Sequence, residues 1–144
     1  MFVTLRCLTK AFEVAEFFIE KKVYYHDTDS GGVVYYANYL KFMEEARTEF
    51  CLDRGVKLAD WFKKGLAFVV VHIEIDYKAP AQYADMLQVT AGIEKLGNSS
   101  IHFIQEVKNK EKILVQARTV WACVGKDFKT QDLPQEVRSS LSGN

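Results

Sequence analysis

A long stretch of helical periodicity, flanked on both sides by strand periodicity, constrains the fold of this chain most. Between residues 36 and 54 the apolar side chains recur every three or four positions, which at about 100° per residue predicts one buried face of a helix. The residues of that face are Tyr39, Phe42, Met43, Ala46 and Phe50. Asn38 is placed to cap the helix by accepting from its first backbone N–H groups, and Gly55 is placed to end it.

Alternating apolar residues predict strands before and after this helix. One strand precedes it, between Phe17 and Tyr25, and four follow it in series. The first of these four covers residues 67–78, and one of its faces is expected to carry Val69, Val71, Ile73, Ile75 and Tyr77. The other three cover residues 87–93, 101–107 and 113–124.

Turn-forming residues separate the last three strands, and a short helix is expected over residues 58–64. The order is therefore strand, long helix, and an antiparallel meander of four strands. These patterns predict an α+β fold in which a curved antiparallel sheet of about five strands wraps around one long helix, because that arrangement buries every apolar face.

Length and charge narrow the class of protein. The chain has 144 residues and no net charge. This length fits one domain over residues 1–144, with a hydrophobic core large enough to be stable without disulfide bonds or a structural metal. Balanced charge argues against a nucleic-acid partner. The longest apolar run, residues 66–71, is too short to span a membrane. Residues 129–144 are polar and are expected to form a short helix or a frayed tail.

Cysteine usage and the first residues predict a cytoplasmic protein. Cys7, Cys51 and Cys123 are an odd number without a CxxC pair, which is typical of reduced thiols. Residues 1–13 mix charged and apolar side chains and do not form the apolar centre of a secretory signal.

The segment from Tyr24 to Tyr39 carries the residues with the clearest chemical potential. Asp27 and Asp29 lie between a strand and the start of the long helix, beside the pair Gly31-Gly32. A helix start offers unpaired N–H groups that can stabilise a developing oxyanion, and a nearby carboxylate can act as base or nucleophile. The residues alone equally allow an ordinary Asx- and Gly-rich turn in which Asp29 caps the helix.

The same segment resembles the signature of hotdog-fold acyl-CoA thioesterases of the 4-hydroxybenzoyl-CoA thioesterase class, and it is most similar to the Tol-Pal-associated, YbgC-like branch. The matching residues are Tyr24-Tyr25, Asp27-Thr28-Asp29, Gly31-Gly32-Val33-Val34-Tyr35, Asn38-Tyr39 and Glu45-Ala46-Arg47-Thr48-Glu49, followed later by Asp76-Tyr77 and Pro80-Ala81. Many members of that branch carry histidine where this chain has Tyr36, whereas the 4-hydroxybenzoyl-CoA enzymes carry tyrosine there.

The resemblance implies a thioester hydrolase without a metal or redox cofactor, in which CoA enters only as part of the substrate. Asp29 falls on the catalytic carboxylate, Tyr25 on a tyrosine that lines the site, and the backbone N–H of Tyr36 on the oxyanion donor. The implied substrate-binding residues are Gly32, Val33, Asn38, Ser99 and Ser100. The last two lie in a turn where relatives contact the phosphates of CoA.

The resemblance also implies a homo-oligomer, a dimer and in many members a tetramer, with the site between two subunits. Three alternatives stay open beside an acyl-CoA thioesterase: a thioesterase for acyl carrier protein, a protein that binds an acyl ligand without catalysis, and a hotdog dehydratase. The last needs a histidine near the helix, and residues 31–50 contain none.

The remaining charged residues are expected to be structural. His26, Asp27 and Asp29 lack further metal ligands nearby. On the helix, Arg47 and the glutamates Glu44, Glu45 and Glu49 are expected to be solvated, with Arg47 contacting a glutamate. His72 and His102 are expected to face water or to be structural.

Overall fold

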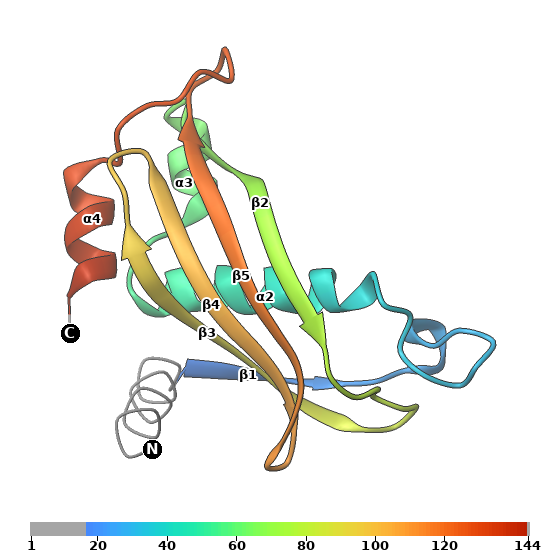
Figure 1. The fold of residues 1–144 in the computed structure, drawn as a ribbon. Helices are drawn as coiled ribbons and strands as arrows, with labels where there is room; N and C mark the ends of the chain where they lie inside the picture. Colours follow the sequence, from blue (N-terminus) through green and yellow to red (C-terminus); the bar gives the residue numbers. More distant parts are fainter. Residues whose placement is uncertain (1–16, 144) are drawn as a thin grey trace.

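The computed structural model describes residues 17–143, and the expectations for residues 1–13 and Cys7 fall outside this range. One five-stranded sheet and one long helix form most of it (Figure 1). The elements in chain order are β1 (Phe17–Lys22), a short 3-10 helix η1 (Tyr25–Asp27), α2 (Asn38–Asp53), α3 (Leu58–Lys63), β2 (Ala67–Tyr77), β3 (Met86–Leu96), β4 (Ser100–Asn109), β5 (Lys112–Val124) and α4 (Gln135–Ser142). The predicted α+β class is confirmed.

The order of the strands corrects one part of the prediction. The sheet runs β1-β3-β4-β5-β2 with every neighbouring pair antiparallel, so only β3, β4 and β5 form a meander. β2 crosses to the far edge and pairs with β5, while β1 pairs with β3. Local alternation could not reveal this crossing, because the long connection from residue 78 to residue 85 permits either neighbour.

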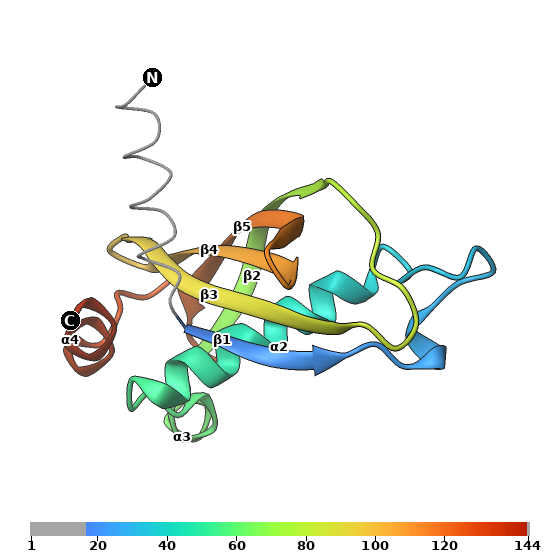
Figure 2. The same cartoon turned by 90° about the horizontal axis from the view of Figure 1, so that it is seen from below.

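α2 lies along the inside of the curved sheet, as Figure 2 shows. All five residues of the predicted apolar face are buried, at 3% exposure or less. They pack against the inward residues of the strands, among them Val89, Phe103 and Trp121. The predicted stop is also confirmed, because Gly55 has a φ of +82° and Val56 donates back to the carbonyl of Cys51 at 2.8 Å.

The predicted cap at the start of α2 is wrong. Asn38 is the first helical residue, and its side chain donates from Nδ2 to the carbonyl of Asp27 at 2.9 Å instead of accepting from the helix. The N-cap position is Ala37, which makes no side-chain cap. The first turn of α2 is therefore tied to η1, and its own N–H groups receive no side-chain acceptor from this position.

A β-bulge in β2 corrects the predicted face of that strand. The pairing with β5 shifts between Val70 and His72, which leaves Val71 as the extra residue. After the bulge Ile73 and Ile75 lie opposite the buried Thr119 and Ala117, but before it the inward residue is Val70, opposite Trp121. Val69 and Val71 therefore do not share the face of Ile73, because one inserted residue inverts the alternation.

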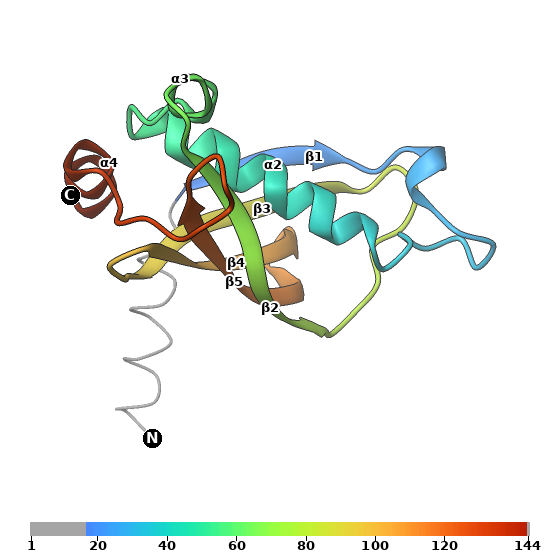
Figure 3. The same cartoon turned by 90° about the horizontal axis from the view of Figure 1, so that it is seen from above.

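Residues 129–144 include an ordered helix. α4 buries Val137 and Leu141 on one side, and Arg138 donates from Nη2 to the carbonyl of Gly97 at 2.8 Å. Figure 3 shows α4 beside the turn between β3 and β4, at the end of the molecule opposite the loop that leads into α2.

Candidate active site

The loop between η1 and α2 forms a small hairpin of its own. Thr28 bridges to Val34, and the N–H of Asp29 donates to the carbonyl of Val33 at 2.9 Å. Val33 also bridges to Gln82 in the loop before β3, which fixes the hairpin to the rest of the chain. Gly32 allows the tight return because its φ is +78°, a conformation that other residues rarely adopt.

The two aspartates of this loop have different environments. Asp27 is 7% exposed, its Oδ2 accepts from the N–H of Tyr24 at 2.9 Å, and its carbonyl accepts from the N–H of Tyr35 at 3.0 Å. Asp29 is exposed, and its only described side-chain contact is Oδ1 accepting from the N–H of Gly31 at 2.8 Å. Asp27 therefore holds the loop in place, and Asp29 has a carboxylate available to a ligand.

This geometry tests the structural interpretation of Asp29, in which an Asx turn places it as the cap of the long helix. Its bond to Gly31 is an Asx turn, as the structural interpretation predicted. Asp29 does not cap α2, because that helix begins nine residues later at Asn38. The carboxylate keeps its second oxygen, Oδ2, without a described partner within residues 17–143.

The backbone at Tyr36 presents a free donor at the entrance to α2. Within the described residues, no backbone or side-chain acceptor receives the N–H of Tyr36 or of Ala37. The carbonyl of Tyr36 is occupied, because it accepts from the hydroxyl of Tyr77 at 3.0 Å. An unpaired N–H at the positive end of a helix is suited to bind a carbonyl oxygen that is gaining negative charge.

Tyrosines gather around this donor. Tyr36 and Tyr39 each lie against Tyr77, with ring centroids 6.2 and 5.7 Å apart, and the three line a cavity of about 300 Å³ together with Val34 and Pro80. Tyr39 is held by its hydroxyl, which accepts from the N–H of Ala81 at 3.0 Å. Burial raises the pKa of both Tyr39 and Tyr77, so these phenols stay neutral near pH 7.

Tyr35 connects this aromatic group to Asp29. Its ring lies 4.9 Å from that of Tyr36, and the Tyr36 phenol is the main cause of its raised pKa. The Asp29 carboxylate adds to the raised pKa of Tyr35. Sequence reasoning assigned no role to Tyr35 or Tyr77. Tyr77 could have been found from the matching pair Asp76-Tyr77, whereas nothing in the sequence distinguishes Tyr35 from its neighbours.

The comparisons with known proteins identify the family of this chain. The family model described as the thioesterase superfamily matches residues 31–116, and Asp29 lies two residues before that match. This chain belongs to the thioesterase superfamily. The acyl-CoA thioester hydrolase YbgC of Escherichia coli is 36% identical over 118 residues, which cover 81% of this chain and 88% of that protein. The acyl-CoA thioesterase YbgC of Haemophilus influenzae is 37% identical over 83% of this chain and 90% of its own length.

Solved structures support the same family and fold. The crystal structure of a 1,4-dihydroxy-2-naphthoyl-CoA thioesterase from Synechocystis superposes with a TM-score of 0.82 and is 28% identical. That match covers 88% of this chain and 96% of the other. The predicted hotdog fold and the predicted resemblance to the YbgC-like branch are therefore confirmed.

The predicted site residues of this thioesterase-superfamily chain lie in two separate places. Asp29, Gly32 and Val33 are in the hairpin, and Tyr36 and Asn38 follow at the start of α2. Tyr25 is in η1, 80% exposed, with its ring 6.0 Å from that of Tyr83 and no described contact with Asp29. The hairpin and the helix start thus bring together most of the predicted set, with Tyr25 at its rim.

Ser99 and Ser100 lie at the opposite end of the same chain. They occupy the turn between β3 and β4, where Ser99 bonds to Asp132 and Ser100 to His102. Figure 3 shows the turn between β3 and β4 beside α4 at one end of the molecule, and the loop that leads into α2 at the other end. One chain therefore does not bring these serines to Asp29.

Across residues 17–143, no three His, Cys, Asp or Glu side chains are grouped so that they could hold a metal ion. None of the described helices has both the length and the apolar character needed to cross a membrane.

Proposed function

We propose that this chain hydrolyses acyl-CoA thioesters to a free acid and CoA. The observation that carries the proposal is that one loop holds both an exposed Asp29 carboxylate and, seven residues later at the entrance to α2, the unbonded N–H of Tyr36. Family membership supports it, since curated relatives of this chain are acyl-CoA thioester hydrolases.

In the proposed reaction the N–H of Tyr36 donates to the thioester carbonyl oxygen, which gains negative charge as the carbon is attacked. Asp29 either takes a proton from a water molecule that attacks the carbon, or attacks the carbon itself and forms a mixed anhydride that water then hydrolyses. In both routes the C–S bond breaks, the CoA thiolate takes up a proton, and water supplies the new oxygen of the acid. Both routes require an ionised Asp29.

The proposed enzyme is a homodimer, because one chain leaves the site incomplete. β2 is an edge strand, and Val70 and Val71 on it are 51% and 59% exposed. A long edge with exposed apolar residues is a template for another strand. Antiparallel pairing of two β2 edges about a two-fold axis sets the first residue of one strand beside the last residue of the other. The Ser99–Ser100 turn of the second copy is then expected to approach the Asp29 hairpin, which lies at the opposite end of its own chain. A tetramer and a cytoplasmic location stay predictions.

The test is thioester hydrolysis by the Asp29→Asn variant, followed as thiol release from short, long and aryl acyl-CoA. Asparagine keeps the oxygen that accepts from Gly31, so the Asx turn and the melting temperature should be preserved. Loss of the charge should lower kcat by at least about 100-fold, which is the usual contribution of a general base.

A matched control exists in the same chain. Asp127 is an exposed aspartate whose Oδ1 accepts from the N–H of Lys129 at 3.1 Å, the same kind of turn without a helix start beside it. Asp127→Asn should leave the rate unchanged. If Asp29→Asn hydrolyses acyl-CoA as fast as this control, Asp29 is not the catalytic carboxylate. Faster turnover of matched acyl carrier protein substrates by the unmodified chain would reassign the substrate.

A further inference from the structure

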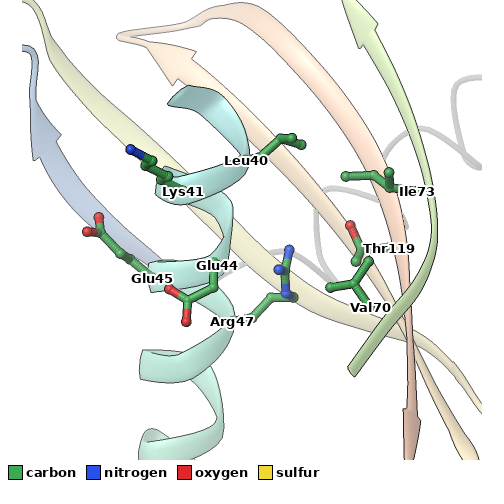
Figure 4. Close-up of a pocket in the computed structure, with 8 residues that line it drawn as sticks. All are labelled: Leu40, Lys41, Glu44, Glu45, Arg47, Val70, Ile73 and Thr119. Carbon is green, nitrogen blue, oxygen red and sulfur yellow. The ribbon is translucent and has the colours of Figure 1, made fainter. Parts of the chain in front are cut away.

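A second cavity, of about 590 Å³, lies between α2 and β2, farther along α2 than the Asp29 hairpin. Figure 4 shows Leu40 and Arg47 pointing from the helix toward Val70, Ile73 and Thr119, with Lys41 and Glu45 pointing away. Leu40, Val70 and Ile73 form its apolar lining, Arg47 and Thr119 are its buried polar residues, and Lys41, Glu44 and Glu45 lie at its edge. We refer to it as the α2–β2 cavity.

Arg47 is a buried cation without a carboxylate partner, which corrects the expectation that it is solvated and contacts a glutamate. It is 3% exposed, and no acidic oxygen of the described residues lies within 4.0 Å of it. Its Nη1 donates to Oε1 of Gln105 at 2.9 Å, and its guanidinium stacks 5.5 Å from the ring of Trp121. Gln105 is fixed in turn, because its Nε2 donates to the carbonyls of Met43 and Thr90.

Unused donors remain in this cavity. Within the described residues, Nε of Arg47 and the hydroxyl of Thr119 are buried and have no hydrogen-bond partner. Nη2 of Arg47 has no described acceptor either. Leaving a buried polar group without a partner is costly, and an unpaired buried charge is more costly still. Burial lowers the pKa of Arg47 to about 10, so the side chain is still charged near neutral pH.

The charged residues around Arg47 do not supply the missing acceptor. Glu44, one turn before it, favours the charged form of Arg47 from a distance and bonds instead to the hydroxyl of Thr48 at 3.3 Å. Glu45 pairs with Lys21 at 3.3 Å on the other side of the helix. An arginine held rigidly by Gln105, beside an open apolar cavity and an unpaired hydroxyl, is complementary to a ligand that brings an acceptor oxygen.

We propose that the α2–β2 cavity takes the acyl group of the substrate, and that Arg47 and Thr119 bind a hydroxyl or carboxyl oxygen carried by that group. This inference rests on the proposed function and names its substrate class: acyl-CoA oxygenated far from the thioester. Arg47 lies nine residues beyond Asn38, which is roughly 14 Å along the helix axis. The oxygen recognised at Arg47 is therefore at the distal end of an extended acyl group, and an apolar chain fits the walls between.

The experiment compares hydrolysis of chain-length-matched acyl-CoA that end in a methyl, a hydroxyl or a carboxylate group. The unmodified chain should have a higher kcat/KM for an oxygenated substrate than for its methyl-ended match. Arg47→Met and Thr119→Val remove the donors while keeping the side-chain volume, since neither variant leaves a large void. Arg47→Met should reduce the preference by roughly 10- to 100-fold, as expected for one hydrogen bond to a charged group, and Thr119→Val by about 10-fold at most.

The methyl-ended substrate is the internal reference in each variant, because damage to the fold lowers kcat/KM for both substrates together and leaves their ratio unchanged, whereas loss of the donors lowers the ratio. Arg118→Met is the matched arginine control, since Arg118 is exposed on the outer face of the sheet and pairs with Glu94 at 3.0 Å. The ratio of kcat/KM for the oxygenated and methyl-ended substrates should be the same in Arg118→Met as in the unmodified chain. Comparing the hydroxyl and carboxylate substrates identifies which oxygen the cavity takes.

Two outcomes would overturn the inference while leaving the proposed function intact. One is equal kcat/KM for oxygenated and methyl-ended substrates in the unmodified chain. The other is an Arg47→Met variant that is monomeric in light scattering but keeps the preference for oxygenated over methyl-ended substrates. That result would mean that a second copy of the chain, and not the acyl group, occupies the cavity. If no thioester is hydrolysed, the proposed function fails instead. Calorimetric binding of the same substrates then decides the inference, which stands only if the oxygenated one binds more tightly and Arg47→Met removes the difference.

Discussion

Burial separates residues of the same chemical type that lie close together in this chain. Asp27 and Asp29 are both acidic and two positions apart, but only Asp27 is enclosed and bonded by the backbone of its own loop. On α2, Arg47 is enclosed while Glu44 faces solvent. Because burial favours the neutral form of a group unless a partner compensates, the enclosure of Arg47 lowers the pKa of its guanidinium.

Cys51 provides a prediction at this scale. Burial raises the pKa of its thiol from 9.0 to about 12, so the unfolded chain loses this proton near pH 9 while the folded chain keeps it. The stability due to the neutral thiol is therefore complete below pH 9 and decreases as the pH rises toward 12. The unfolding free energy of the unmodified chain, relative to Cys51→Ala, should fall by roughly 1 kcal/mol between pH 9 and 10.

Urea unfolding of both proteins at pH 7, 8, 9 and 10 measures this difference. Cys51→Ala is less stable at neutral pH because it leaves a void, and its deficit should narrow only above pH 8. A deficit that is constant from pH 7 to 10 would show that the Cys51 thiol ionises equally in both states.

At the scale of elements, α4 is the helix whose packing the polar composition of residues 129–144 indicated least well. Its sequence is polar, but Val137 and Leu141 are four residues apart and both are buried, while Arg138 between them binds the carbonyl of Gly97. The helix therefore packs as part of the fold and orders the turn between β3 and β4. That turn holds Ser99 and Ser100, which links a terminal helix to a predicted CoA contact.

Leu141→Ala should lower the free energy of unfolding by about 2–4 kcal/mol, as is usual for a buried leucine. Leu52→Ala removes the same atoms from a leucine of α2 that is 42% exposed, and it should cost less than about 1 kcal/mol. Chemical denaturation of the two variants side by side tests this. Equal losses would mean that α4 does not contribute to the core.

At the scale of the whole molecule, the edge of the sheet formed by β2 is the surface along which we expect a second chain to pair. The opposite edge strand, β1, has 6 residues and carries Lys21 and Lys22, whereas β2 has 11 and exposes two adjacent valines. Short, charged edges discourage pairing, and long apolar edges invite it. This asymmetry predicts a single preferred interface along β2.

If the proposed dimer forms along β2, Val71→Lys should give a monomer in light scattering and lower thioester hydrolysis at least 10-fold, because a monomer leaves the Asp29 site open to water. Phe18→Lys on β1 is the control: Phe18 is 46% exposed at the other edge, and its replacement should leave mass and rate unchanged. A Val71→Lys variant that stays dimeric would place the interface elsewhere. A fully active monomer would show that the site is complete in one chain.

Much of the fold follows from the sequence because its signals are local. The helical face from Tyr39 to Phe50 and the alternation of Ile101, Phe103 and Val107 depend only on which residues repeat at which period. The strand order and the bulge at Val71 were not predicted. Both depend on which strand becomes the neighbour of β5, and that choice is made by packing between residues far apart in the chain.

The sequence by itself determined most of the elements, the family and the place of Asp29 in a loop between a strand and the long helix, since each is set by neighbouring residues or by a contiguous motif. Only the tertiary structure decided that Asp27 is enclosed and Asp29 is not, that Tyr77 reaches the carbonyl of Tyr36, and that Arg47 is buried beside Gln105. The physical reason is that exposure and unpaired donors arise where distant segments meet. A charged residue at the border of a helical face, such as Arg47, is predicted to be solvated, because the sequence does not show which strand packs opposite it.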